Sequence, residues 1–422
     1  MTKSKKFKAE AFDIMQYFYG SVHEPLIHCL IDFSCHIDKA ALIKAVTLSL
    51  KTNPLISCCF NIAARRPYWE EKNFTGEDIV RVVIADSNEE EQKTKLLAST
   101  IDITKEPQLK IYLFQKQDTD TLCIIINHML CDGAGFKEYL YTLSNLYNEC
   151  KSGNKNLLNA KSLPRNSYQI LNNFKFTEKL NVFFSKYNLS KQENELKYSL
   201  QGDKNNPLFV ALDITKDEFA HIKAYAKNKD VTVNDLIITA YMKVLHKRTG
   251  EERIIIPCPV DLRKYLYPNQ EHGICNLTSN FICDVIIMKN DSFEDILIQV
   301  SKQIKEQKSN DNCLKPVIIL ELVFNLLPFA ILHKVFNKFF TIPVTSFTNL
   351  GVIDKKQLRF NDAEITHTYI TGAVKYVPYF QIAVSTYDNT CTLSCNLYGT
   401  PEDKICIEQF LMDMKNELLC HK

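Results

Sequence analysis

The stretch LCIIINHMLCDGAGF, residues 122–136, predicts a strand, a tight turn and a helix in succession. Residues 122–126 are apolar and mostly β-branched, as in a buried strand, and they place His128 just beyond the strand's C-terminal end. Gly133 and Gly135 permit a sharp turn of the backbone after it. Helical spacing then brings six large side chains to one face: Phe136, Tyr139, Leu140, Leu143, Leu146 and Tyr147.

A histidine at the end of a buried strand is a candidate general base. Its neutral imidazole accepts a proton from an alcohol, amine or thiol near neutral pH. Asp132, four residues further on, is placed to hold the turn by accepting hydrogen bonds or an arginine fork. The same spacing also occurs around hydrogen-bonded core histidines, so the interpretation depends on the other segments of the chain.

Three segments together resemble one known superfamily. HMLCDG, residues 128–133, fits the HxxxDG signature of the chloramphenicol acetyltransferase-like superfamily, which includes nonribosomal peptide condensation domains, alcohol acetyltransferases and CoA-dependent acyltransferases. PCPVDLR, residues 257–263, is similar to its PVDLR segment, and TNLG, residues 348–351, is similar to its SNLG-type segment. Condensation domains usually carry a second histidine where this chain has Asn127, so the chain looks more like the single-histidine acyltransferase branch.

The resemblance implies an α/β fold of two chloramphenicol acetyltransferase-like sandwich lobes with a solvent channel between them. It implies His128 as the general base, with Asp132 and Gly133 in structural roles and Arg263 as the ion-pair partner of Asp132. The backbone N–H of Gly133 is a candidate donor to the developing oxyanion. Further candidates for the oxyanion site and the channel wall are Asn127, Thr348, Asn349 and Gly351.

The function implied is transfer of an acyl group from a thioester to an alcohol or amine. Acyl-CoA is the expected co-substrate, the acceptor is a small molecule, and no cofactor is expected to stay bound. Two alternatives remain open: a condensation-type enzyme that uses substrates carried by an acyl carrier protein, and a non-catalytic binding relative. We expect a monomer.

Length and patterning predict more than one core. A chain of 422 residues that is 45% hydrophobic exceeds the usual size of a single core. Strands and helices alternate in both halves, with a helix expected at 38–51, a strand at 55–60, a helix at 89–101 and a hairpin at 379–397. We therefore predict lobes at 1–165 and 208–422. The polar connection at 166–207 carries aromatic residues, among them Phe174, Phe176 and Phe184, that should pack on something.

Composition argues against several classes of function. The 51 basic and 49 acidic side chains leave a net charge of +2, which gives no field that would gather nucleic acid. The 15 cysteines form no C-x-x-C pair, so zinc binding finds no support and a reducing, cytoplasmic setting is expected. No second histidine or carboxylate lies at ligand spacing from His128, so no metal site is expected, and no G-x-S-x-G elbow of a serine hydrolase occurs.

One apolar segment, residues 316–340, resembles a membrane span in composition. Glu321, Asn325 and Pro328 interrupt it, whereas a span needs about 20 mostly apolar residues. We predict no transmembrane segment here. We expect a buried or groove-lining helix beside the channel, where it would limit the length of the acyl chain.

Overall fold

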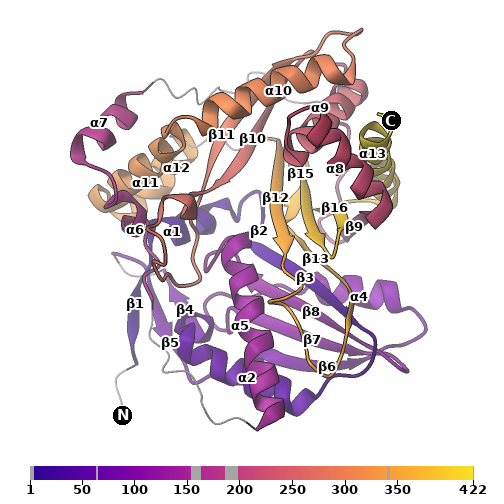
Figure 1. Cartoon of the computed structure of the whole chain (residues 1–422). Coiled ribbons are helices and arrows are strands. Elements are labelled where there is room, and N and C mark those ends of the chain that lie inside the picture. The colour runs from indigo at the N-terminus through magenta and orange to yellow at the C-terminus, as the bar shows by residue number, and fades with distance from the viewer. Residues whose placement is uncertain (1–3, 63–64, 154–162, 186–197, 340–342, 422) are drawn as a thin grey trace.

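The computed structural model describes residues 4–62, 65–153, 163–185, 198–339 and 343–421. Its helices and strands form two stacked halves, each with a sheet and helices packed on it (Figure 1). Phe340, at the end of the apolar segment, and residues 186–197 of the predicted connection lie outside the described residues. The lobe boundaries proposed from the sequence stay a prediction.

The first half is built on a five-stranded sheet with β8 at its centre. Strand β8, Asp120–Asn127, is buried along its whole length. Helices α2, Lys39–Thr52, and α5, Gly133–Ser152, share a core with one face, while α4, Glu89–Leu97, adds Leu97 to a smaller core on the other. Burial on both faces explains the unbroken apolar run in the sequence. The other strands of this sheet are β13 Ile365–Thr371, β3 Leu26–Phe33, β7 Leu109–Gln115 and β6 Val80–Ile84.

The second half is organised by a six-stranded sheet in which β16 is central. Its apolar face shares one core with helices α8, α9, α10 and α13. The strands are β12 Thr345–Ile353, β15 Phe380–Tyr387, β16 Thr390–Tyr398, β14 Val374–Tyr376, β2 His23–Glu24 and β9 Pro207–Ile214. The helices are α8 Lys216–Asn228, α9 Val233–Thr249, α10 Phe293–Lys308 and α13 Pro401–Leu419.

Two smaller sheets complete the described fold. Strands β10, Arg253–Asp261, and β11, Thr278–Ile286, form an antiparallel pair that ends beside the loop after β8. The third sheet consists of β1 Lys6–Lys8, β5 Tyr68–Glu71 and β4 Cys58–Asn61. The remaining α-helices are α1 Ala11–Tyr19, α3 Gly76–Ile79, α6 Tyr168–Leu171, α7 Phe176–Phe184, α11 Lys315–Leu326 and α12 Phe329–Phe339. Short 3₁₀ turns are η1 Pro54–Ser57, η2 Leu262–Tyr265 and η3 Asn312–Leu314.

The chain crosses between the halves near its C-terminal end. Strand β13 pairs antiparallel with β3 of the first sheet, and β14 directly after it pairs with β2. In Figure 1 the late-chain colour of β13 therefore lies beside the early-chain strand β3. The sheet of the first half thus contains β13 from late in the sequence, and the sheet of the second half contains β2 from early in the sequence.

Most elements predicted from patterning are present, with local corrections. The helix begun by Asp38 and the hairpin of β15 and β16 are confirmed. The strand predicted at 55–60 begins only at Cys58, because Pro54 starts a 3₁₀ turn first. The helix predicted at 89–101 ends at Leu97.

The aromatic side chains of the connection differ in their packing. Phe174 packs against Tyr265 with ring centroids 5.3 Å apart. Phe184 packs edge-on against Phe183 with ring centroids 5.1 Å apart, but Phe176 and Phe184 on α7 are 72% and 77% exposed, so neither belongs to a core.

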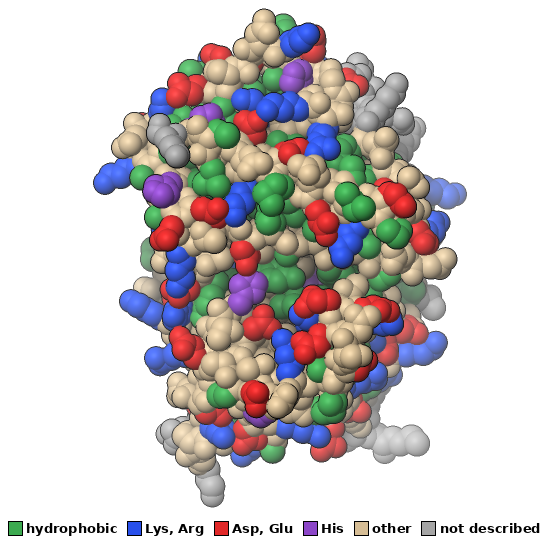
Figure 2. All heavy atoms as spheres, turned by 90° about the vertical axis from the view of Figure 1, so that its right-hand side faces the viewer, with side chains coloured by type: hydrophobic (Ala, Val, Ile, Leu, Met, Phe, Trp, Pro, Cys, Tyr) green, Lys and Arg blue, Asp and Glu red, His purple; other side chains and the backbone are tan. Residues whose placement is uncertain are grey.

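The described part of the apolar segment, residues 316–339, forms α11 and α12, separated at Leu327 and Pro328. Among the described residues no helix is both long and apolar enough to span a bilayer. All fifteen cysteines are free thiols. On the face shown in Figure 2, acidic and basic side chains are interspersed, in keeping with the near balance of charge.

Candidate active site

His128 lies directly after β8, where its backbone N–H donates to the carbonyl oxygen of Pro25 at 2.8 Å. Its side chain is partly exposed, but Nδ1 is buried without a hydrogen-bond partner. Nε2 is therefore the ring nitrogen open to a substrate. Burial lowers the pKa of His128 below its ordinary value of 6.5, so the imidazole is neutral at pH 7 and able to accept a proton.

Asp132 caps α5 and ties four segments together. Its carboxylate accepts hydrogen bonds from the backbone N–H of Gly135 at 2.9 Å and of Leu277 at 2.7 Å, and from Thr278 Oγ1 at 2.8 Å. Both terminal nitrogens of Arg263 donate to it at 3.1 Å. Burial alone raises the pKa of Asp132, but the charge of Arg263 and these hydrogen bonds outweigh it, and the pKa lies below its usual range. Asp132 is thus an ionised anchor for the loop.

Arg263 reaches this anchor from the turn that follows β10. Its side chain is only 10% exposed, and it also donates to Asp261 at 3.1 Å and to the carbonyl oxygen of Cys275 at 2.9 Å. The neighbouring carboxylates raise the pKa of the guanidinium despite the burial. The ion pair expected from the sequence is present, and it joins the loop after β8 to the second half of the chain.

The two glycines after Asp132 serve close packing. The chain turns after His128, but neither Gly133 nor Gly135 has a positive φ, so the turn does not depend on the conformational freedom of these glycines. A Cβ on Gly133 would lie 2.2 Å from Leu350 Cδ2, and one on Gly135 would lie 2.9 Å from the carbonyl oxygen of Cys275. Gly133 therefore brings the start of α5 against β12.

The segment 348–351 continues as strand β12, with a bulge between Asn349 and Gly351. Gly351 has a φ of +74°, the conformation that favours glycine. The side-chain oxygen of Asn349 accepts from Gly351 N–H at 2.8 Å, and its amide nitrogen donates to Asn234 at 2.9 Å. Thr348 is half-buried, whereas Asn349 is exposed.

Asn127 has a different environment from the other candidates. It is fully buried, its amide nitrogen donates to Gln108 Oε1 at 2.7 Å, and its side-chain oxygen accepts from Met129 N–H at 2.9 Å. These bonds hold the turn that carries His128. The side chain faces the interior of the first half.

Sequence reasoning missed two side chains that support the same loop. Arg165 donates to the carbonyl oxygens of Leu130 at 2.8 Å and Ile274 at 3.0 Å, and it pairs with Asp13. Asn276 donates to the carbonyl oxygen of His128 at 2.8 Å. Both residues lie far from His128 in sequence and carry no motif, so only the tertiary structure could identify them.

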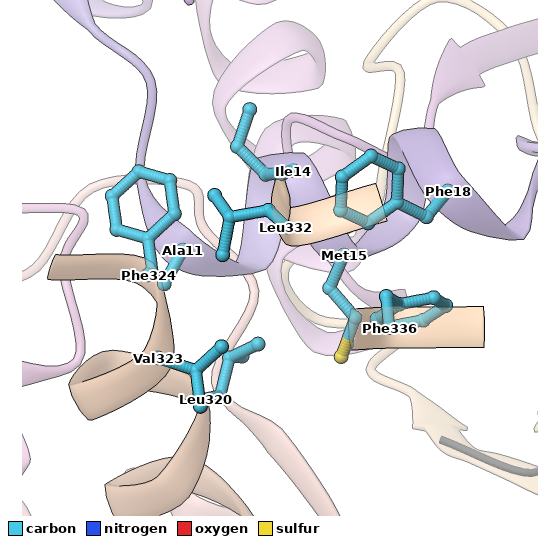
Figure 3. A pocket seen from close by; sticks show the side chains of 9 residues that line it. All are labelled: Ala11, Ile14, Met15, Phe18, Leu320, Val323, Phe324, Leu332 and Phe336. Atoms are coloured by element: carbon cyan, nitrogen blue, oxygen red, sulfur yellow. The ribbon is translucent and has the colours of Figure 1, made fainter. Parts of the chain in front are cut away.

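An apolar pocket lies between α1 and the two helices of the 316–340 segment (Figure 3). Phe18 and Met15 of α1 meet Phe324 of α11 and Phe336 of α12 around a cavity of about 20 Å³. That volume admits roughly one water-sized group. Among the described residues, no group of three side chains could hold a metal ion.

A condensation domain family model matches residues 27–322, more than half of the chain. Surfactin synthase subunit 1 of Bacillus subtilis (strain 168) is 23% identical over 175 residues, which are 39% of this chain and 5% of that protein. The chain therefore corresponds to a small part of the length of this curated relative.

Solved structures share the fold over nearly the whole chain. The first condensation domain of the calcium-dependent antibiotic synthetase, in complex with a substrate analogue, has a TM-score of 0.71 at 11% identity, covering 99% of this chain and 97% of that one. Trichothecene 15-O-acetyltransferase from Fusarium sporotrichioides has a TM-score of 0.69 at 13% identity, covering 99% and 95%. The predicted chloramphenicol acetyltransferase-like fold is thereby confirmed.

Proposed function

Because this chain belongs to the condensation domain family, we propose that it transfers an acyl group from a thioester, with acyl-CoA as donor, to an alcohol or amine. His128 is the general base. The observation that carries the proposal is the neutral imidazole at the end of β8, with one ring nitrogen buried and the other open to a substrate.

The reaction assigned to His128 is a proton relay. Nε2 removes the proton from the acceptor hydroxyl or amine while that oxygen or nitrogen attacks the thioester carbonyl. The tetrahedral intermediate then collapses, the carbon–sulfur bond breaks, and the imidazolium returns its proton to the leaving thiolate. The products are an ester or amide and a free thiol, and no other reactant is consumed.

Oxyanion stabilisation is assigned to the start of α5. Gly133 occupies the first helical position, where the backbone N–H has no acceptor within the helix and the helix dipole favours negative charge. Asn349 is a weaker candidate, since its amide already donates to Asn234. Thr348 and Gly351 are assigned to the wall of the channel, because β12 meets α5 at Gly133.

The acyl chain is assigned to the pocket between α1, α11 and α12. Its apolar lining fits a hydrocarbon, and its small volume favours short chains unless the helices move apart. The fifteen free thiols support action in a reducing compartment, such as the cytoplasm. The proposal includes a small-molecule acceptor and a monomeric protein.

A carrier-bound donor is the second candidate. The family match and the surfactin synthase relative favour it, whereas Asn127 in place of the first histidine favours the single-histidine acyltransferases. The two candidates share His128 and differ only in what holds the acyl thioester.

The test is thiol release from a panel of acyl-CoAs, with and without alcohols and amines, compared with the same acyl groups on a phosphopantetheinyl carrier protein. We expect acceptor-dependent release that His128→Ala abolishes and His221→Ala, on the exposed face of α8, leaves intact. Release from the carrier alone would select the second candidate. Wild-type release by a folded His128→Ala protein would overturn both.

A further inference from the structure

Lys375 and His23 form a buried basic pair close to the loop of His128. They lie opposite each other on β14 and β2, and Lys375 Nζ is 3.1 Å from His23 Nδ1. They are only 9% and 6% exposed, respectively. A lysine at this depth normally has an anionic partner.

No carboxylate lies within ion-pair distance of Lys375 among the described residues. The neighbouring carboxylate, Glu24, follows His23 in β2 and so points to the opposite face of the strand pair, where it accepts from Tyr376. The nearby thiol of Cys395 is neutral, since burial raises its pKa to about 12. The charge of Lys375 is therefore uncompensated by the protein.

His23 adds a second donor without an acceptor. Burial, followed by the charge of Lys375, lowers its pKa well below 6.5, so the ring is neutral. Nδ1 accepts from the ammonium of Lys375, which leaves the proton on Nε2, and Nε2 is buried without a partner. The pair thus presents an ammonium without an anionic partner and an N–H without an acceptor, and burying these two groups costs free energy.

The position of the pair links it to both parts of the candidate site. His128 N–H bonds to Pro25, two residues after His23, and the charge of Lys375 acts on the imidazole of His128. On the other side, the ring of Tyr19 lies 6.0 Å from that of His23 and 5.3 Å from that of Phe336, which lines the apolar pocket.

We propose that Lys375, positioned by His23, binds the carboxylate of the acyl acceptor, which is an aliphatic hydroxy or amino acid. After it donates to His23 Nδ1, the ammonium of Lys375 keeps two N–H donors, which suit the two oxygens of a carboxylate, and the apolar surroundings suit the aliphatic part of the ligand. The role of the ligand as acceptor rests on the proposed acyl transfer, but the carboxylate site does not. A free carboxylate also distinguishes this acceptor from one tethered to a carrier as a thioester.

Calorimetry with hexanoate and its neutral counterpart hexanamide tests the site without catalysis. We expect the wild-type chain to bind hexanoate at least about tenfold more tightly than hexanamide, and Lys375→Met to lose that preference. Lys110→Met is the matched control, because Lys110 is a half-buried strand lysine that has its own carboxylate, Glu106, at 3.1 Å. If Lys375→Met does not fold, the hexanoate-to-hexanamide ratio of the wild type still decides the question.

Kinetics with a hydroxyalkanoate and its amide then test the role of the ligand. We expect the amide to raise KM at least about tenfold in the wild type and to have no such effect in Lys375→Met. Equal binding of hexanoate and hexanamide would overturn the site even if His128-dependent transfer is found. Charge-dependent binding without any transferase activity would uphold the site while removing the proposed function. Displacement of hexanoate by an equal concentration of inorganic phosphate would indicate a phosphate site and overturn the carboxylate assignment.

Discussion

Two buried cations near the His128 loop, Arg263 and Lys375, differ in what neutralises them. Arg263 donates to the carboxylate of Asp132 with two nitrogens, and Asp261 adds a second negative charge. Lys375 has only the neutral ring of His23. Accordingly, the carboxylates raise the pKa of Arg263, whereas burial lowers that of Lys375 to about 8.

The difference separates structural from binding roles. A compensated buried pair already has its hydrogen bonds made, so removing one member leaves an unpaired charge and destabilises the fold. An uncompensated buried charge destabilises the fold as it stands, and a ligand of opposite charge would relieve it. Substitutions at the two sites should therefore change stability in opposite directions.

The largest expected effect concerns the candidate base, His128. His128→Ala should reduce the rate of acyl transfer about 100- to 10,000-fold, since general-base catalysis contributes that much. The free energy of unfolding should change by less than about 1 kcal/mol, because the side chain is partly exposed and its buried Nδ1 has no hydrogen-bond partner. Thiol-release kinetics and urea unfolding of the same sample check both values. A large loss of stability would instead make His128 a core residue.

Arg263→Met should lower the free energy of unfolding by about 3–5 kcal/mol, because Asp132 would remain as a buried, unpaired carboxylate. The control is Arg253→Met, which breaks an ion pair with Asp284 where the arginine side chain is 53% exposed, and should cost at most about 1 kcal/mol. Urea unfolding measures both. Equal losses would mean that Arg263 is no more than a surface charge.

Lys375→Met should leave the free energy of unfolding unchanged or raise it by about 1 kcal/mol, since an apolar side chain of similar length replaces a buried, uncompensated charge. The folded-state pKa of about 8 lies below the ordinary 10.5, so protonated Lys375 costs stability below pH 8. That cost disappears as the pH rises toward 10.5. The gain in Lys375→Met should therefore be present at pH 7 and absent near pH 10.5, and destabilisation at pH 7 would point to an anionic partner within the protein.

A half-buried cation, His367, gives the smallest effect. His367 Nε2 lies 3.1 Å from Asp213 Oδ2 of β9, and His367 Nδ1 lies 3.6 Å from Asp32 Oδ2 of β3. The contact with Asp213 is an ion pair and lacks the alignment of a hydrogen bond. These carboxylates raise the pKa of His367 to about 9. The pair stabilises the fold fully below pH 6.5 and loses that contribution as the pH rises through 9. His367→Gln should thus be less stable than wild type at pH 6 but equal to it near pH 10, by urea unfolding; solvent screening keeps the difference small.

The sequence was sufficient to predict the parts that depend on local pattern. The strand before His128 and the α5 helix follow from periodicity, whereas the Asp132–Arg263 pair was implied by the family resemblance that the three short motifs carry. Periodicity did not distinguish the 3₁₀ turn at Pro54 from a strand, because both bury apolar side chains there.

The supporting residues could not be predicted in the same way. Arg165 and Asn276 bond to the His128 loop only through tertiary contacts, and Lys375 and His23 meet each other in the same way; each is an ordinary polar residue in its own segment. The sequence correctly indicated that glycine matters at 133 and 135. Glycine is needed there because Leu350 and Cys275, which are distant in sequence, leave no room for a Cβ, and no local pattern reveals such a contact.

Strand β13 constrains the order in which the first sheet can form during synthesis of the chain. During synthesis the N-terminal half emerges from the ribosome first, but β3 has no partner on one edge until residues 365–371 have been translated. An open strand edge is a site for mispairing with other chains. The first sheet must therefore stay incomplete through most of translation, and contacts over such a sequence separation make its completion a slow step of folding.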